Sequence, residues 1–142
     1  NKGIHIDQLK SGLEYRINIL NCSSNIIKEK IIFGHGITEQ QNKLVECYKT
    51  LNLDSEENYY LSYKLNSHNY YLFLLMTGGF TLLLLFLAMI IYCVRSSLIY
   101  ENSTYFSFLI LIFGVLLVEN FFSRMYGVFV FVLFNSIWYR KI

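Results

Sequence analysis

The sequence has no proline and only one tryptophan in 142 residues. The absence of proline excludes proline-induced helix breaks. No stripe or cluster of basic residues is present, which excludes the electrostatic footprint of a nucleic-acid-binding protein. The three cysteines have no metal-ligand spacing, and the spacing of Cys22 and Cys47 leaves open whether they pair in an oxidising compartment.

Charge is also absent from a long stretch, Leu65 to Val94, which is mostly Leu, Phe, Ile and Tyr. A helix needs about 20 apolar residues to cross the hydrocarbon core of a bilayer. The stretch therefore predicts a transmembrane helix over about 69–94. Asn66 or Ser67 is the expected N-cap, and the polar residues 95–97 are the expected end.

Two shorter apolar stretches follow, and they predict spans over about 104–119 and 126–139. A single broken helix would place Glu119 and Arg124 in the middle of the membrane at considerable cost. Two crossings joined by a tight turn are therefore favoured.

The first 66 residues are polar and electrically balanced, with eight basic and eight acidic side chains. Residues 5–30 have helical periodicity, and the glycine-rich residues 33–37 are expected to end that helix. A second helix is expected to start with Thr38 as its cap, and 54–66 is expected to be a polar, tyrosine-rich loop. The expected apolar face of the first helix consists of Leu9, Leu13, Ile17, Leu20, Ile27 and Ile31.

These patterns predict an all-α integral membrane protein, with an extracytoplasmic helical loop (1–66) followed by three transmembrane helices (67–142). The positive-inside tendency places Arg95, Arg140 and Lys141 on the cytoplasmic face, and residues 1–68 outside. A chain that starts in a polar loop and ends in spans is expected to be the C-terminal part of a longer membrane protein.

His68 is the leading candidate for chemistry, because it is expected at the mouth of the first span. The positive end of a helix macrodipole disfavours the imidazolium, and a neutral imidazole can accept a proton from a hydroxyl nucleophile. The alternative is an interfacial histidine paired with Asn or Tyr. His35, flanked by glycines, is expected to be exposed.

Arg16 falls on the apolar face of the first predicted helix. A guanidinium stranded there needs an anionic partner, and its paired donors match phosphate oxygens. The alternative is that its stem snorkels to water or to a carboxylate. Arg124 is a second candidate for the same anion, and the alternative for Glu119 and Arg124 is a plain ion pair that joins two helix ends.

Three runs resemble the O-antigen ligase and polymerase family. The run from His68 to Phe80, HNYYLFLLMTGGF, resembles the family's His-Asn opening with a glycine pair before a leucine-rich span. Tyr15-Arg16, followed by FGHG from Phe33, resembles its arginine segment and Gly-x-Gly turn. VENFFSRMYGVF, from Val118 to Phe129, resembles its Glu-Asn…Arg…Gly element before the last span.

The resemblance implies a metal-independent glycosyltransferase without a cofactor, in a multi-span bundle of the GT-C type in a bacterial inner membrane. This chain would supply the large periplasmic loop and the last three transmembrane helices. The implied donor is a glycan on a polyprenyl diphosphate. The implied acceptor is a hydroxyl of lipid A-core or of another glycan.

By the same resemblance, His68 matches the base that deprotonates the acceptor, and Arg16 matches the arginine that holds the diphosphate. Further substrate-binding positions are implied at Asn69, Glu119 and Arg124. The shaping glycines are Gly34, Gly36, Gly78 and Gly79. A hypothesis from another class is a noncatalytic membrane subunit whose polar domain docks a partner.

Overall fold

The computed structural model describes residues 3–50 and 67–139, with side chains for 16–50 and 67–138. The predicted loop over 54–66, together with Arg140 and Lys141, lies outside the described residues. All regular secondary structure within the described ranges is helical, which confirms the all-α class there. The helices are α1 (Gly3–Glu29), α2 (Ile37–Thr50), α4 (Tyr70–Ile99), α5 (Ser103–Val115), the 3-10 helix η1 (Phe121–Ser123) and α6 (Met125–Tyr139).

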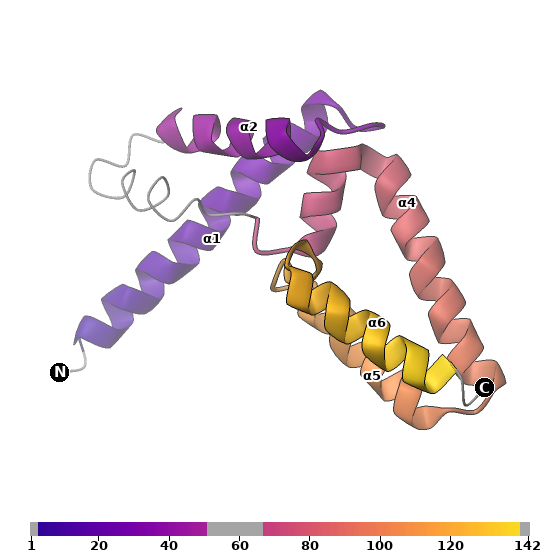
Figure 1. Ribbon diagram of the computed structural model, residues 1–142. Helices are drawn as coiled ribbons and strands as arrows, with labels where there is room; N and C mark the ends of the chain where they lie inside the picture. The colour runs from indigo at the N-terminus through magenta and orange to yellow at the C-terminus, as the bar shows by residue number, and fades with distance from the viewer. Residues whose placement is uncertain (1–2, 51–66, 140–142) are drawn as a thin grey trace.

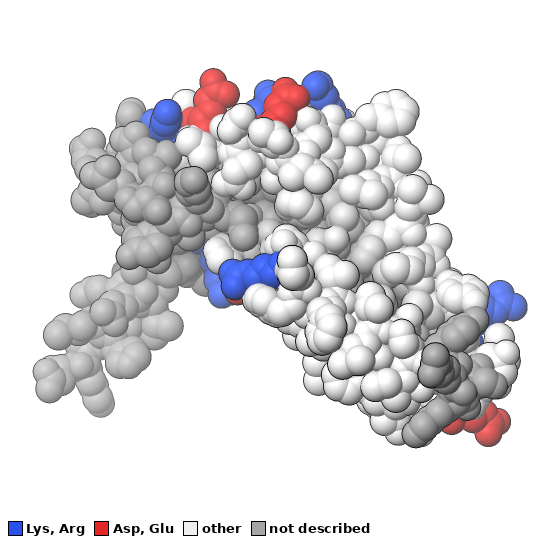
Figure 2. Space-filling view, viewed as in Figure 1, with Lys and Arg blue, Asp and Glu red and all other residues white. Residues whose placement is uncertain are grey.

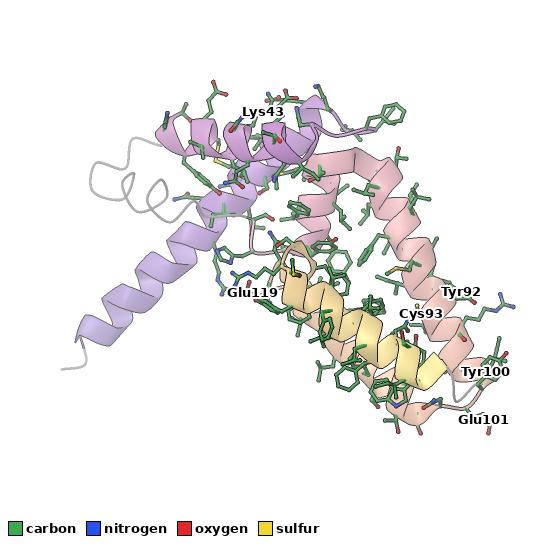
Figure 3. The ribbon with its side chains drawn as sticks, viewed as in Figure 1. Lys43, Tyr92, Cys93, Tyr100, Glu101 and Glu119 are labelled. Carbon is green, nitrogen blue, oxygen red and sulfur yellow. A yellow bond between two sulfur atoms is a disulfide. The ribbon has the colours of Figure 1, made fainter. Side chains whose placement is uncertain are left out.

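Figure 1 shows two groups of helices that α4 connects. The first group is α1 and α2, which pack against each other and against the beginning of α4. The second group is α5 and α6, which run side by side and contact the rest of α4 and η1. Figure 3 shows Glu101 and Glu119 at opposite ends of this second group.

The core of the first group lies on a different face of α1 from the expected one. The buried α1 residues are Ile19, Cys22 and Ile26, which pack on Leu44 and Tyr48 of α2 and on Met76 of α4. Of the predicted apolar face, Ile17, Leu20 and Ile31 are exposed, whereas Ile27 is partly buried and packs against this core. Packing against α2 buries a neighbouring face of α1. Residues 19, 22 and 26 on that face are also apolar, and their spacing places them on one side of a helix.

A disulfide joins α1 to α2 in this core. Cys22 and Cys47 are bonded, with their Cα atoms 5.9 Å apart and a sequence separation of 25. The pairing that the spacing left open is therefore present. Cys93 is the free cysteine of the described residues.

Replacing both Cys22 and Cys47 with Ser is expected to destabilise the α1–α2 unit by about 3 kcal/mol, because the cross-link restricts a loop of this length in the unfolded chain. The measurement is the thermal unfolding of the purified protein in detergent, followed by limited proteolysis of α1 and α2. Reduction of the wild-type protein should reproduce the effect, and an unchanged transition in both cases would contradict the stabilising role.

The start of α2 differs from the expectation. The helix begins at Ile37, directly after Gly36, which has a φ of 85°. The backbone carbonyl of Gly36 accepts from the Gln40 N–H at 3.1 Å. Thr38 is therefore a residue of the first turn and not the cap.

α4 is not a straight rod, because it breaks at Gly79. Gly79 has φ 62° and ψ −158°, which is not helical, and Figure 1 shows the sharp bend that results. The break divides α4 into a short arm (Tyr70–Gly78) and a long arm (Phe80–Ile99). The helix predicted over about 69–94 is therefore present, but the break at Gly79 divides it.

The loop between α1 and α2 supplies the hydrogen-bond partners that the break requires. The N–H groups of His35 and Gly36 donate to the carbonyls of Met76 and Thr77, each at 2.8 Å. In the other direction, the Phe80 N–H donates to the Ile31 carbonyl at 2.8 Å. The carbonyls at the end of the short arm and the amides at the start of the long arm are therefore satisfied by one segment.

Glycine is required at two of the four predicted shaping positions for the close approach of these segments. A Cβ on Gly34 would lie 2.5 Å from the Thr77 carbonyl carbon, and a Cβ on Gly79 would meet the Ile32 carbonyl. Both residues also have a φ of 62°. A Cβ on Gly78 would meet the side chain of Leu82, and Gly36 has open space around it.

His35 is buried within this junction, which corrects the expectation that it is exposed. Its side chain is 1% exposed, and its Nε2 donates to the Ile26 carbonyl at 3.0 Å. The ring and the backbone N–H of His35 therefore tie the end of α1 to the short arm of α4.

The ends of α4 also differ from the prediction. Asn69 is the N-cap, since its side chain accepts from the Leu72 N–H at 3.1 Å, so neither Asn66 nor Ser67 has that role. The helix continues through Arg95, Ser96 and Ser97 to Ile99. Among the described helices, α4 is the one long and apolar enough to cross a membrane, and only 17% of its most apolar window is buried.

Aromatic side chains hold the second group of helices together. The ring of Phe86, in the long arm of α4, lies 5.4 Å from Tyr70, 6.5 Å from Phe113 and 6.2 Å from Phe122. The Tyr105 hydroxyl of α5 donates to the Asn135 side chain of α6. α5 and α6 are apolar but short, with 13 and 15 residues.

Candidate functional site

A cleft of about 180 Å³ lies where three distant segments meet. Arg16, Ile19 and Leu20 line it from α1, Ser67, His68 and Asn69 from the segment before α4, and Leu117 and Val118 from the end of α5. Small-molecule sites usually have about 300–1,000 Å³. The cleft therefore has room for a compact head group and not for a whole glycan chain.

The cleft contains both residues that the sequence places at the centre of the chemistry. Arg16 and His68 line the same cavity, although the end of α1 and the whole of α2 lie between them in the sequence. Asn69 also lines it. Glu119 lies beside it, whereas the four predicted shaping glycines are not among its lining residues and belong to the junction at the break of α4.

His68 is held in a backbone conformation that side chains rarely adopt. Its φ is 45°, in the left-handed region, which costs a residue with a Cβ roughly 1–2 kcal/mol. Such strain persists only where the surrounding structure enforces it, and it is concentrated at functional sites.

Hydrogen bonds on both sides of His68 enforce this conformation. The Ser67 hydroxyl donates to the Asn69 carbonyl at 3.0 Å. The Asn69 side chain donates to the Leu117 carbonyl at 2.9 Å, and the Tyr70 N–H donates to the Leu116 carbonyl at 2.9 Å. The segment before α4 is therefore fastened to the end of α5.

The electrostatic environment of His68 differs from the one expected. His68 precedes the N-cap and does not lie in the first turn, so the macrodipole argument does not describe it. Its Nδ1 faces the Oε1 of Glu119 at 3.7 Å, and its side chain is 37% exposed. The Glu119 carboxylate therefore lies beside the ring, at a distance longer than a hydrogen bond.

Glu119 and Arg124 do not form the ion pair that was the alternative to a substrate role. The Glu119 carboxylate is directed to His68. The Arg124 Nη1 donates to the Tyr126 hydroxyl at 3.1 Å, and its guanidinium carbon lies 5.9 Å from the centre of that ring. Arg124 is not among the lining residues of the cleft.

The Arg16 side chain is exposed at the rim of the cleft. Among the side chains of 16–50 and 67–138, no carboxylate lies within ion-pair distance of its guanidinium. The neighbouring Leu20, which also lines the cleft, is 48% exposed. A cation beside exposed apolar side chains suits a ligand with both a charged and a hydrocarbon part.

Two buried polar residues near His68 were not predicted from the sequence as part of the site. Ser67 is 4% exposed and Asn120 is 2% exposed, and the Asn120 amide donates to the Ser67 hydroxyl at 3.3 Å. The Oδ1 of Asn120 is buried without a hydrogen-bond partner among the described residues. The sequence indicated them only by position, because Ser67 directly precedes His68 and Asn120 directly follows Glu119.

No protein-family model matches this sequence, and no curated protein or solved structure matches it either. In the described ranges, no group of three or more His, Cys, Asp or Glu side chains is arranged to hold a metal ion.

Proposed function

We propose that this chain belongs to a membrane glycosyltransferase of the O-antigen ligase and polymerase type. Its substrates are a glycan on a polyprenyl diphosphate and a sugar hydroxyl of lipid A-core or of a growing polysaccharide. The observation that carries the proposal is the presence of Arg16 and His68 in one cleft. The same two residues belong to two of the three runs that resemble the family.

In the proposed reaction, His68 accepts the proton of the acceptor hydroxyl, through Nε2, because Nδ1 is directed to Glu119. The hydroxyl oxygen attacks the anomeric carbon of the donor, and the bond from that carbon to the diphosphate oxygen breaks. Polyprenyl diphosphate leaves with the electron pair. The reaction needs no metal ion in this scheme, because Arg16 stabilises the charge that develops on the leaving group.

Glu119 acts as a positioning residue in this scheme. Its carboxylate orients the imidazole and stabilises the imidazolium during the transfer, as the acid does in a Ser-His-Asp arrangement. Asn69 orients the segment before α4 through its cap and through the Leu117 carbonyl.

The proposed location is a bacterial inner membrane, with α1 and α2 on the periplasmic side and the cleft within the outer leaflet, open to that side. The long arm of α4 has about 20 residues, or about 30 Å of helix, which matches a hydrocarbon core. α5 and α6 would be the second and third spans, although each needs its flanking residues to reach across. The Cys22–Cys47 disulfide supports an oxidising compartment for the first group of helices.

The ring contacts of Phe86 support a cleft below the lipid surface. Phe86 follows the break of α4 by about two turns, or about 10 Å of helix, and its ring contacts Tyr70, the residue after Asn69. A site at this depth in the outer leaflet suits a diphosphate whose prenyl chain remains in lipid.

Replacing Arg16 with Ala tests the proposal. We expect transfer from a polyprenyl diphosphate-linked glycan to fall about 10–100-fold, because a charge-assisted hydrogen bond contributes about 1.5–3 kcal/mol. Arg16→Lys should recover part of the loss, since an ammonium lacks the paired donors. The measurement is glycan transfer by the full-length protein in proteoliposomes, with the donor concentration varied.

The matched control is Arg95→Lys, in the other end of α4 and away from the cleft, which should transfer at the wild-type rate. Full activity of Arg16→Ala would remove Arg16 from the site. Absence of transfer by the wild-type protein with either class of acceptor would contradict the proposed function and favour a noncatalytic membrane subunit.

A further inference from the structure

The loop that closes the break of α4 has an unusually apolar exposed surface. Ile31, Ile32, Phe33 and Ile37 are 47%, 61%, 76% and 71% exposed, and we call these four residues the apolar loop tip. Isolated exposed apolar residues are ordinary, but a contiguous set marks an interaction surface.

This surface is continuous with the exposed apolar side of α4. The Phe80 N–H is bonded to the Ile31 carbonyl, and Phe80 itself is 49% exposed. Leu84, one turn further along the long arm, is 60% exposed. The apolar loop tip therefore extends the side of α4 that is proposed to face lipid.

Part of the loop's backbone is paired, which lowers the cost of entering hydrocarbon. Irregular backbone is costly in lipid because unpaired N–H and C=O groups have no water to bond with. Here the loop pairs with the broken ends of α4: His35 and Gly36 donate to the short arm, and the Ile31 and Ile32 carbonyls accept from the long arm. The Ile32 carbonyl accepts from both the amide and the hydroxyl of Thr81.

Charged side chains flank the apolar loop tip on one side. Lys43 donates to Glu29 at 2.5 Å, and this hydrogen bond holds the pKa of the Glu29 carboxyl below its usual range. Lys30 and Glu39 form an exposed pair at 3.8 Å. Figure 2 shows charged side chains gathered along the edge of the molecule over α1 and α2, with an uncharged surface over the part of α4 that follows the bend. This separation is typical of a segment at the border between head groups and acyl chains.

We propose that the apolar loop tip inserts into the acyl-chain region of the outer leaflet, beside the start of the long arm of α4. We expect the lipid bilayer to cover the tip, because the tip is bonded to Phe80, the first residue of the long arm. The length of that arm equals the thickness of the hydrocarbon core. The broken helix and the loop then form a single membrane-embedded unit. This inference rests on the membrane part of the proposed function and not on glycan transfer.

The test uses tryptophan fluorescence of the full-length protein in liposomes. Trp138 is the single tryptophan of this chain, so Trp138→Phe, with any other tryptophan also replaced, provides the background. Phe33→Trp reports on the tip, Leu85→Trp reports on the exposed side of the long arm, and Glu46→Trp reports on the exposed surface of α2. Lipids brominated on their acyl chains quench from the hydrocarbon, and iodide quenches from water.

We expect brominated lipid to quench Phe33→Trp and Leu85→Trp several-fold more than Glu46→Trp, and iodide to show the reverse order. Quenching of Leu85→Trp without quenching of Phe33→Trp would overturn the inference and leave the membrane span intact. Shielding of Phe33→Trp from both quenchers would overturn it in favour of a protein partner. Failure of brominated lipid to quench even Leu85→Trp would overturn the membrane placement itself. Glycan transfer, assayed on the same liposomes, is a separate readout of the proposed activity.

Discussion

Replacing His68 with Asn is expected to lower glycan transfer by about 10²–10⁴-fold, the usual contribution of a general base. Asn is the informative substitution because it tolerates the left-handed backbone that His68 adopts, and its amide cannot take up the proton. Ala at the same position has no polar side chain that favours the left-handed backbone, so it would confuse folding with chemistry.

The measurement is the initial rate of transfer at saturating donor and acceptor, so that kcat is isolated from binding. Membrane insertion and the Cys22–Cys47 disulfide serve as controls, and both should be unchanged, since neither involves the His68 side chain. A normal rate in the Asn variant would remove His68 from the catalytic step, even if Arg16 proved essential.

Replacing Gly79 with Ala is expected to cost about 3 kcal/mol or more of unfolding free energy. The backbone at φ 62° and ψ −158° is in a region that is essentially restricted to glycine, where another residue costs about 1–3 kcal/mol. In addition, the new Cβ would meet the Ile32 carbonyl, which accepts the hydrogen bonds of Thr81. To relieve this clash, the loop between α1 and α2 would have to move away from α4.

The matched control is Gly114→Ala in α5, where a Cβ meets nothing within 4 Å. That variant should be neutral or stabilised by up to about 1 kcal/mol, because Ala is the better helix former. The comparison is made by thermal unfolding in the same detergent. Equal transitions for the two variants would contradict the importance of the break. We also expect Gly79→Ala to lower transfer, because the junction sets α1, which carries Arg16, against α4.

The existence and type of the helices were accessible from the sequence, because they depend on local periodicity and composition. α1 and α2 lie close to their predicted ranges, and the charge-free stretch from Tyr70 onward lies within the one described helix that is long and apolar enough to cross a membrane. The caps were less accessible. Asn69 is the cap of α4 because the chain before it is bonded to the end of α5, and this contact has no local signal.

The buried face of α1 also could not be predicted from local sequence alone. Its sequence offers two apolar stripes, one through Ile17 and Leu20 and the other through Ile19, Cys22 and Ile26. Periodicity cannot choose between them, and the packing of α2 with its disulfide chooses the second. Leu20 then remains exposed, and together with Arg16 it lines the cleft.

The residue types available for chemistry, the helical class within the described ranges and the apolar character of α4 all follow from composition and short-range spacing. The shared cleft of Arg16 and His68, the approach of Glu119 to the imidazole and the break of α4 at Gly79 depend on contacts between distant segments. The physical reason lies in the backbone hydrogen bonds. A glycine pair is compatible with a continuous helix, and the break is stable only because carbonyls and amides from a segment up to 49 residues away satisfy its open ends.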